Sequence, residues 1–216
     1  MTGTVFVVDD DAAVRDALVQ LLEADGLRAK ACASAEAFLA ACRPGRAGCV
    51  VLDVRLPGIS GLELQRALAA RGIRLPIIFL TGHGDVATSV RALKAGALDF
   101  LEKPVQGEEL LAHVRNALQL NARDQREQAD KTAAQARLAR LTPREREVMP
   151  MVLAGHPNKE IARRLGISHR TVEIHRTRVL QKMGAATPLE LAAVAQACGM
   201  QIADGDRAVA RKARRR

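Results

Sequence analysis

The chain has 216 residues, of which 48% are apolar and 26% charged, a composition that suits one or two packed globular domains. No apolar run approaches the roughly 20 residues that a membrane-spanning helix requires. The four cysteines form no CxxC pair and have no histidine at ligand spacing, which disfavours a zinc or redox site. The first residues enter a strand pattern without a signal-type segment. We therefore expect a cytoplasmic protein with no membrane partner.

Charge is divided unevenly along the chain. Residues 1–120 carry 13 Lys/Arg and 14 Asp/Glu, whereas residues 121–216 carry 20 and 10, within an overall net charge of +9. A basic second half favours a polyanionic partner. The basic tail, 201–216, fits two interpretations: a charge run for solubility, or a sequence-independent attraction to phosphates.

Apolar strand patterns alternate with helical patterns over the first 120 residues. Strands are expected near 4–8, 27–31, 49–53, 77–81 and 98–102, and helices near 12–24, 34–42, 61–71, 86–95 and 106–120. This alternation predicts an α/β domain with a doubly wound, five-stranded parallel sheet. Asp11 and Ser34 can cap the first two helices, and Ser60 or Gly61 opens the third.

The remaining residues show helical patterns alone. Residues 121–140 are polar, Ala-rich and free of Gly and Pro, which indicates a helical linker that can continue the helix begun near 106. Further helices are expected at about 143–153, 158–165, 169–183 and after Thr187-Pro188. Residues 159–168 have the pattern of a helix-turn-helix. The predicted organisation is an α/β domain (1–120), a linker (121–140), an all-α helix-turn-helix domain (141–200) and the tail.

Polar side chains follow four of the predicted strands: Asp9 and Asp10, then Asp53, Thr81 and Lys103. Because ligand sites in open parallel sheets form outside the carboxyl ends of the strands, these groups should converge. Three carboxylates provide the hard oxygens that Mg²⁺ prefers. Asp53 can attack a phosphoryl group. Lys103 and the Thr81 hydroxyl can then stabilise charge on the phosphoryl oxygens.

The first domain resembles the receiver domain of bacterial two-component response regulators, which has a flavodoxin-like fold. The resemblance rests on Val8-Asp9-Asp10, Asp53-Val54-Arg55-Leu56-Pro57-Gly58, Thr81-Gly82-His83-Gly84-Asp85 and Phe100-Leu101-Glu102-Lys103-Pro104. The segment from Thr81, together with 94–100, is similar to the NarL/FixJ type. The pattern covers nearly all of residues 4–120.

The resemblance implies a role for each of these residues. Asp53 is the phospho-acceptor for a sensor histidine kinase, and Lys103, followed by a cis bond to Pro104, contacts the phosphoryl group. Thr81 and Phe100 form the switch, and the face around 86–104 dimerises. Mg²⁺ is held by Asp9, Asp10, Asp53 and the backbone carbonyl of Arg55.

The helix expected from His169 has two distinct sides on a helical wheel. Val172, Val179 and Met183 fall on the side that packs inward. The solvent-facing side mixes polar and apolar groups, as a major-groove recognition helix does; it holds Arg170, Glu173, Ile174, Thr177 and Gln181, with Arg178 at its edge.

The second domain resembles the LuxR-type helix-turn-helix over about 140–197, through Leu141–Val148, Asn158–Ala162 and Ser168–His175. In that family the positions of Glu173, Ile174 and Thr177 commonly meet bases. Glu173 can accept from cytosine N4 and Ile174 can contact a thymine methyl. An intrahelical pair of Glu173 with Arg170 or Arg176 is the alternative. The predicted DNA-binding residues are Lys159, Arg170, Glu173, Ile174, Arg176, Thr177, Arg178 and Lys182.

These features predict a non-enzymatic response regulator, in which phosphorylation of Asp53 promotes homodimerisation and sequence-specific binding to double-stranded DNA that regulates transcription. One alternative is a phosphotransfer sink with secondary DNA output, which the basic recognition helix disfavours. Another is a constitutive DNA-binding protein with a vestigial receiver, which the complete set of acids, Thr81 and Lys103 disfavours. RNA binding is the weakest alternative because aromatic residues are only 2% of the chain.

Overall fold

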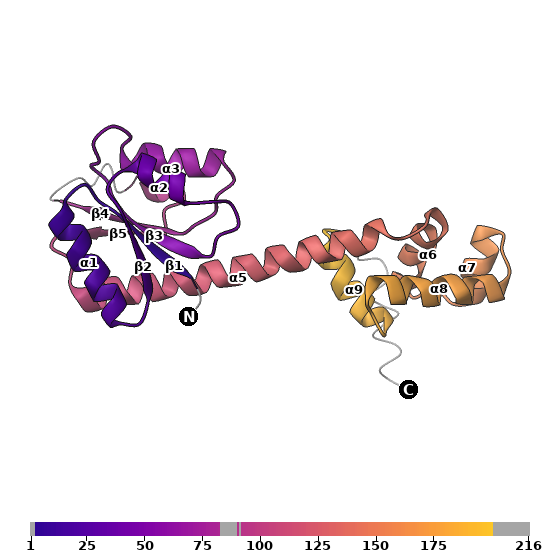
Figure 1. Ribbon diagram of the computed structural model, residues 1–216. Helices are drawn as coiled ribbons and strands as arrows, with labels where there is room; N and C mark the ends of the chain where they lie inside the picture. Colours follow the sequence, from indigo (N-terminus) through magenta and orange to yellow (C-terminus); the bar gives the residue numbers. More distant parts are fainter. Residues whose placement is uncertain (1–2, 83–89, 91, 201–216) are drawn as a thin grey trace. The chain divides into compact units, whose positions relative to one another are not determined.

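The computed structural model describes residues 3–82, 90 and 92–200. The chain divides into two compact units, one up to residue 126 and the other from residue 127 onward. Figure 1 shows strands in the first unit and helices alone in the second, so each unit is considered by itself.

The first unit is built on one parallel sheet, as predicted. Its strand order is β2-β1-β3-β4-β5, and every neighbouring pair is parallel. The chain starts at the interior strand β1, adds β2 on one side of it, and then places β3, β4 and β5 in turn on the other side. This single reversal of the direction in which strands are added is typical of a doubly wound sheet. The strands are β1 (Thr4–Val8), β2 (Arg28–Cys32), β3 (Gly48–Asp53), β4 (Ile77–Thr81) and β5 (Asp99–Glu102).

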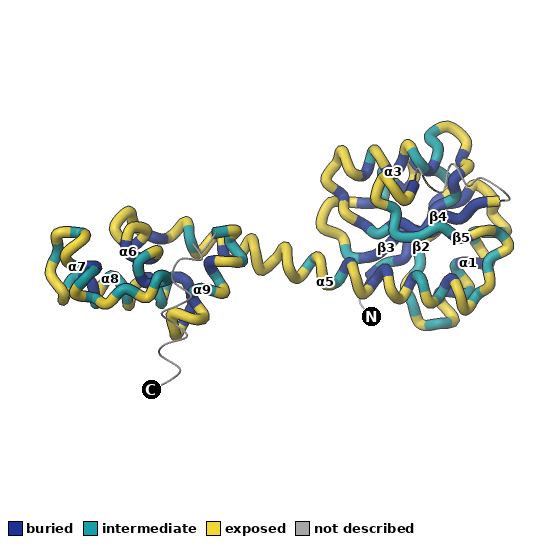
Figure 2. Tube along the Cα trace, turned by 180° about the vertical axis from the view of Figure 1, so that it is seen from behind, coloured by how far each residue is buried: buried dark blue, intermediate teal, exposed yellow. Residues whose placement is uncertain are grey.

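Helices cover both faces of this sheet because consecutive side chains of each strand point to opposite sides. Phe6 and Val8 of β1 belong to a core with α2 and α3, whereas Val5 and Val7 belong to a core with α1 and α5. The strands β1, β3 and β4 are almost entirely buried (Figure 2), whereas the edge strand β2 is largely exposed. The helices are α1 (Ala12–Ala24), α2 (Ala35–Ala41), α3 (Gly61–Ala70) and α5 (Gly107–Ala139).

Side-chain caps begin the first three helices where the sequence predicts them. Asp11 accepts from backbone amides of α1, Ser34 from one of α2, and Ser60 forms a capping box with Glu63 of α3. Half of the helix predicted at 86–95, residues 86–89 and 91, lies outside the described residues.

Helix α5 extends well beyond the predicted end at 120, so the linker does continue the preceding helix. The side chain of Asn121 is buried: its Oδ1 accepts from Gly48 N at 2.9 Å and its Nδ2 donates to the Arg74 carbonyl at 3.1 Å. Gln125 Nε2 donates to the carbonyls of Gly45 and Arg46. These amides attach α5 to the loops that precede β3 and β4.

The second unit contains α6 (Pro143–Leu153), α7 (Asn158–Leu165), α8 (His169–Met183) and α9 (Pro188–Ala197). Val148, Ile161, Val172 and Val179 are fully buried in its core. Gly166, at φ +64°, ends α7 in the left-handed conformation that glycine adopts without strain, and α8 begins three residues later. The predicted helix-turn-helix is therefore present.

Candidate functional site

The three aspartates predicted to meet do lie together at the carboxyl edge of the sheet. Asp9 and Asp10 follow β1, Asp53 ends β3, and one ligand oxygen from each lies within 4.8 Å of the others. Asp9 is buried, Asp53 is partly buried and Asp10 is exposed. The cluster therefore opens to solvent at Asp10.

Lys103 follows β5 and bridges two of these carboxylates. Its Nζ lies 2.6 Å from Asp9 Oδ2 and 2.7 Å from Asp53 Oδ2. Burial opposes the charge on this ammonium, but the hydrogen bonds to Asp53 and Asp9 outweigh burial and raise the pKa of Lys103. A positive charge is thus fixed beside Asp53. The bond from Lys103 to Pro104 is cis, as the resemblance implies.

Backbone amides hold the other oxygen of both bridged carboxylates. Asp11 N donates to Asp9 Oδ1 and Arg55 N donates to Asp53 Oδ1, each at 2.9 Å. Helix α3 begins so close to β3 that a Cβ at Gly61 would lie 2.3 Å from the Asp53 carbonyl oxygen. Only glycine permits this approach. The position of Asp53 is therefore determined by both the sheet and the start of α3.

Thr81 and Phe100 lie on neighbouring strands, Phe100 within β5 opposite Phe79 of β4. Thr81 ends β4, is buried, and donates from Oγ1 to the Gly82 carbonyl at 2.9 Å. The half-buried Phe100 ring lies 6.0 Å from the Phe79 ring, measured between centroids. His83 and the rest of 83–89 lie outside the described residues. The switch role of Thr81 and Phe100 stays a prediction.

The donor set fits Mg²⁺. This ion takes hard oxygen ligands and keeps several waters, and the exposed side of the cluster is where waters could remain. Asp9, Asp10 and Asp53 would supply side-chain oxygens. Arg55 is exposed and lies two residues after Asp53, and its carbonyl as a ligand stays a prediction.

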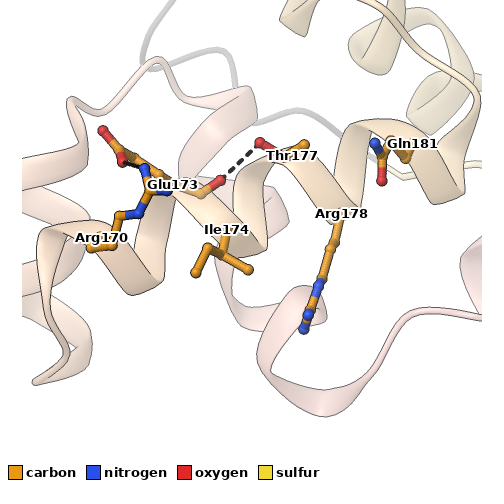
Figure 3. A pocket seen from close by; sticks show the side chains of 6 residues that line it. All are labelled: Arg170, Glu173, Ile174, Thr177, Arg178 and Gln181. Atoms are coloured by element: carbon orange, nitrogen blue, oxygen red, sulfur yellow. Dashed lines mark hydrogen bonds and ion pairs between the residues drawn. The ribbon is translucent and has the colours of Figure 1, made fainter.

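The second candidate site is the outer face of α8. Figure 3 shows a shallow hollow along this helix whose lining side chains all come from α8 itself. Ile174 is 41% exposed, so its side chain is available for an apolar contact. The hollow is lined by Arg170, Glu173, Ile174, Thr177, Arg178 and Gln181.

Contacts within α8 order this face before any partner binds. Arg170 Nη1 lies 3.0 Å from Glu173 Oε2, and His169 Nδ1 lies 3.5 Å from Glu173 Oε1. Thr177 donates to the Glu173 carbonyl at 3.0 Å. The intrahelical pair considered for Glu173 is therefore present with Arg170. Both groups are solvent-accessible, so this pair is weak enough to exchange for a base.

Two predicted DNA-binding cations instead make contacts inside the second unit. Lys182 Nζ lies 2.6 Å from Oε2 of the buried Glu145, and Arg176 donates to Asn158 Oδ1 at 3.3 Å. Lys159 is exposed at the start of α7. A helical wheel cannot detect Glu145 or Asn158 because both belong to other helices. Gln181 lines the hollow but is missing from the predicted DNA-binding set, although its wheel position indicated it.

Comparison with known proteins identifies both units. Residues 5–115 match the family described as "Response regulator receiver domain", and residues 139–195 match "Bacterial regulatory proteins, luxR family". The chain belongs to the response regulators. Its transcriptional output domain is of the LuxR type, which confirms the predicted family and fold class.

The regulator has relatives that align over nearly its whole length. It is 48% identical over 200 residues to the transcriptional regulatory protein FixJ of Azorhizobium caulinodans, covering 93% of this chain and 95% of that protein. It is 49% identical over 186 residues to the transcriptional regulatory protein TdiR of Thauera aromatica, covering 84% and 80% respectively.

Solved structures show the same architecture. The response regulator StyR aligns with a TM-score of 0.85 at 40% identity, covering 91% of this chain and 99% of that one. Full-length FixJ from B. japonicum aligns with a TM-score of 0.57 at 42% identity, covering 93% and 99%.

The family membership establishes a role in transcription regulation, which is non-enzymatic. The receiver implies a histidine kinase as partner, and the LuxR-type domain implies DNA. Among the helices that the structure describes, none is long and apolar enough to cross a membrane.

Proposed function

We propose that the regulator accepts a phosphoryl group on Asp53 from a sensor histidine kinase, and that phosphorylation promotes homodimerisation and sequence-specific DNA binding. The observation that carries this proposal is the cluster of Asp9, Asp10 and Asp53 with Lys103 between two of them. We infer a cytoplasmic location because the DNA partner lies there. The proposed divisions are a receiver (1–120), a helical linker (121–140), a DNA-binding domain (141–200) and a basic tail (201–216).

The phosphoryl transfer follows from the placement of Asp53. One of its carboxylate oxygens attacks phosphorus as the bond between phosphorus and the kinase histidine nitrogen breaks, and the electron pair of that bond stays on the imidazole. The product is an acyl phosphate on Asp53. When bound, Mg²⁺ would neutralise charge on the transferred oxygens.

The neighbouring residues would stabilise that charge in defined ways. Lys103 Nζ already lies 2.7 Å from Asp53 Oδ2, and its raised pKa keeps it a charged ammonium. The same ammonium can therefore contact the phosphoryl oxygens after transfer. The amide of Arg55 holds Oδ1 during the attack. The Thr81 hydroxyl would exchange its contact with the Gly82 carbonyl for a phosphoryl oxygen.

Phosphorylation would rearrange Thr81 and Phe100, and this rearrangement would change the conformation of the face around 86–104. Val90 and Leu93 are 44% and 46% exposed on that face, which supports its use as a dimer surface. Residues 86–89 and 91 of this segment lie outside the described residues. Phosphorylation would act by shifting a pre-existing equilibrium toward the state in which two receivers pair.

Two paired regulators would present two copies of α8 to DNA, which suits a pseudo-palindromic site. Glu173 and Ile174 would read bases, the first through cytosine N4 and the second through a thymine methyl. Arg170 and Arg178, exposed at the same face, would hold phosphates. Affinity would come mainly from the phosphates and sequence choice from the bases.

The test is selection of genomic DNA fragments by the full chain, with and without Mg²⁺ and beryllium fluoride as a phospho-Asp53 mimic. A symmetric motif enriched only with the mimic is the expected result. The same motif without the mimic would mean that the receiver does not gate DNA binding. Diffuse, salt-sensitive retention alone would contradict sequence-specific regulation and favour a phosphotransfer sink.

A further inference from the structure

Arg15, on the second turn of α1, contacts the backbone of the acidic loop. Its Nη1 donates to the Asp9 carbonyl at 2.7 Å and to the Asp10 carbonyl at 2.9 Å. The side chain is half-buried. One guanidinium nitrogen therefore holds two consecutive peptide groups of the segment that carries both acids.

The second of these peptide groups is held at both ends. The Asp10 carbonyl accepts from Arg15, while the amide of the same peptide, Asp11 N, donates to Asp9 Oδ1 at 2.9 Å. Rotation of this peptide would break both contacts. The orientation of the Asp9 carboxylate is thus tied to Arg15 through one rigid peptide plane.

The orientation of the Asp10 carboxylate depends on the backbone more than that of the Asp9 or Asp53 carboxylate does. Asp9 is held by Lys103 and Asp11, and Asp53 by Lys103 and Arg55. Within the described part of the chain, no hydrogen bond or ion pair to the exposed Asp10 carboxylate is present. The direction of that carboxylate is set by its backbone, and Arg15 holds the backbone.

We propose that Arg15 is a positioning residue for Mg²⁺: its guanidinium clamps the Asp9 and Asp10 carbonyls so that the Asp10 carboxylate completes the cation site. This inference rests on the proposed function of the acidic cluster. Groups that orient metal ligands without touching the metal typically change metal affinity by about 10- to 100-fold when removed.

The charge of Arg15 and its contacts with the loop have opposite effects on Mg²⁺ affinity. The positive charge of Arg15 beside the Asp9-Asp10 backbone repels Mg²⁺, so a purely electrostatic role predicts tighter Mg²⁺ binding once Arg15 is removed. The clamp predicts weaker binding. The sign of the change therefore separates the two effects.

The experiment is calorimetric titration of Mg²⁺ alone into the full-length protein and its variants. Arg15→Ala removes the clamp. Arg15→Lys keeps the charge on a side chain one atom shorter, so its nitrogen falls short of the position from which Arg15 Nη1 donates to both carbonyls. Arg66→Ala, which removes an exposed arginine on α3, is the matched control. Thermal unfolding without Mg²⁺ reports whether each variant is folded.

We expect Arg15→Ala to weaken Mg²⁺ binding at least about tenfold, Arg15→Lys to weaken it as well, and Arg66→Ala to leave it unchanged. Millimolar guanidinium should restore part of the affinity of Arg15→Ala, which a variant that had merely lost structure would not show. If Arg15→Ala does not fold, Arg15→Lys carries the test.

Unchanged or tighter Mg²⁺ binding by Arg15→Ala would overturn the clamp, and so would full affinity in Arg15→Lys. Both results leave the proposed function intact. Failure of the unaltered protein to bind Mg²⁺ would overturn the acidic cluster as a cation site, and the clamp with it.

Discussion

Glu145 of α6 offers a test of what stabilises the DNA-binding unit. Its side chain is 2% exposed, and Oε2 accepts from Lys182 Nζ at 2.6 Å and from Thr142 N at 2.9 Å. Replacing Glu145 by Gln keeps the shape and an oxygen for the Thr142 amide. It removes the charge that faces Lys182.

The magnitude follows from the exposure of the two partners. A hydrogen bond to a charged group contributes about 1.5–3 kcal/mol, and breaking a fully buried ion pair costs about 3–5 kcal/mol. Lys182 is 30% exposed, so water replaces part of the lost interaction. We expect Glu145→Gln to lower the free energy of unfolding by about 2 kcal/mol at neutral pH.

The stability difference between the unaltered protein and Glu145→Gln should depend on pH. Burial opposes ionisation of Glu145, but the hydrogen bonds from Lys182 and Thr142 outweigh it and lower its pKa from the usual 4.5. A lowered pKa contributes stability that is present above the unfolded value and lost as pH falls through the folded value. The difference between the unaltered protein and Glu145→Gln should therefore shrink below about pH 4.5.

The assay is urea unfolding followed by circular dichroism, since the chain has no Trp or Tyr for fluorescence. Hydrogen exchange of peptides from α6 and α8 assigns the change to this unit. Glu147→Gln on the same helix is the control, because Glu147 pairs with Arg144 in solvent and should matter by at most about 0.5 kcal/mol. A Glu145→Gln variant as stable as this control would refute the reasoning.

Three further outcomes concern function. Asp53→Asn should accept no phosphoryl group on a phosphate-affinity gel, and should lose the roughly 5- to 150-fold gain in DNA affinity that coupling of this kind provides; retention of that gain after kinase treatment would contradict the switch. Glu173→Gln should move the preference at one base pair from cytosine toward adenine by about 1–3 kcal/mol, measured by binding to substituted operators. Arg178→Ala should weaken binding to all sequences alike and reduce the slope of log affinity against log salt by about 1, whereas an altered sequence preference would indicate a base contact.

Much of the receiver was predictable because its signals are local. Apolar runs and capping residues place strands and helices within one or two residues of those observed, as at Thr4–Val8 and Ala12–Ala24. The extension of α5 to Ala139 was indicated by the polar, Ala-rich composition that follows residue 120. The buried amide contacts of Asn121 had no sequence signal, because its partners precede it by 47 residues or more.

The sequence by itself determined that Asp9, Asp10, Asp53 and Lys103 share one site, since parallel strands bring their carboxyl ends to one edge of a sheet. Only the tertiary structure decided how the groups of each site contact one another. The three-dimensional arrangement links Lys103 to two carboxylates, holds the acidic loop through Arg15, and directs Lys182 to a buried Glu145. Long, flexible cationic side chains can reach several partners, and only packing selects among them.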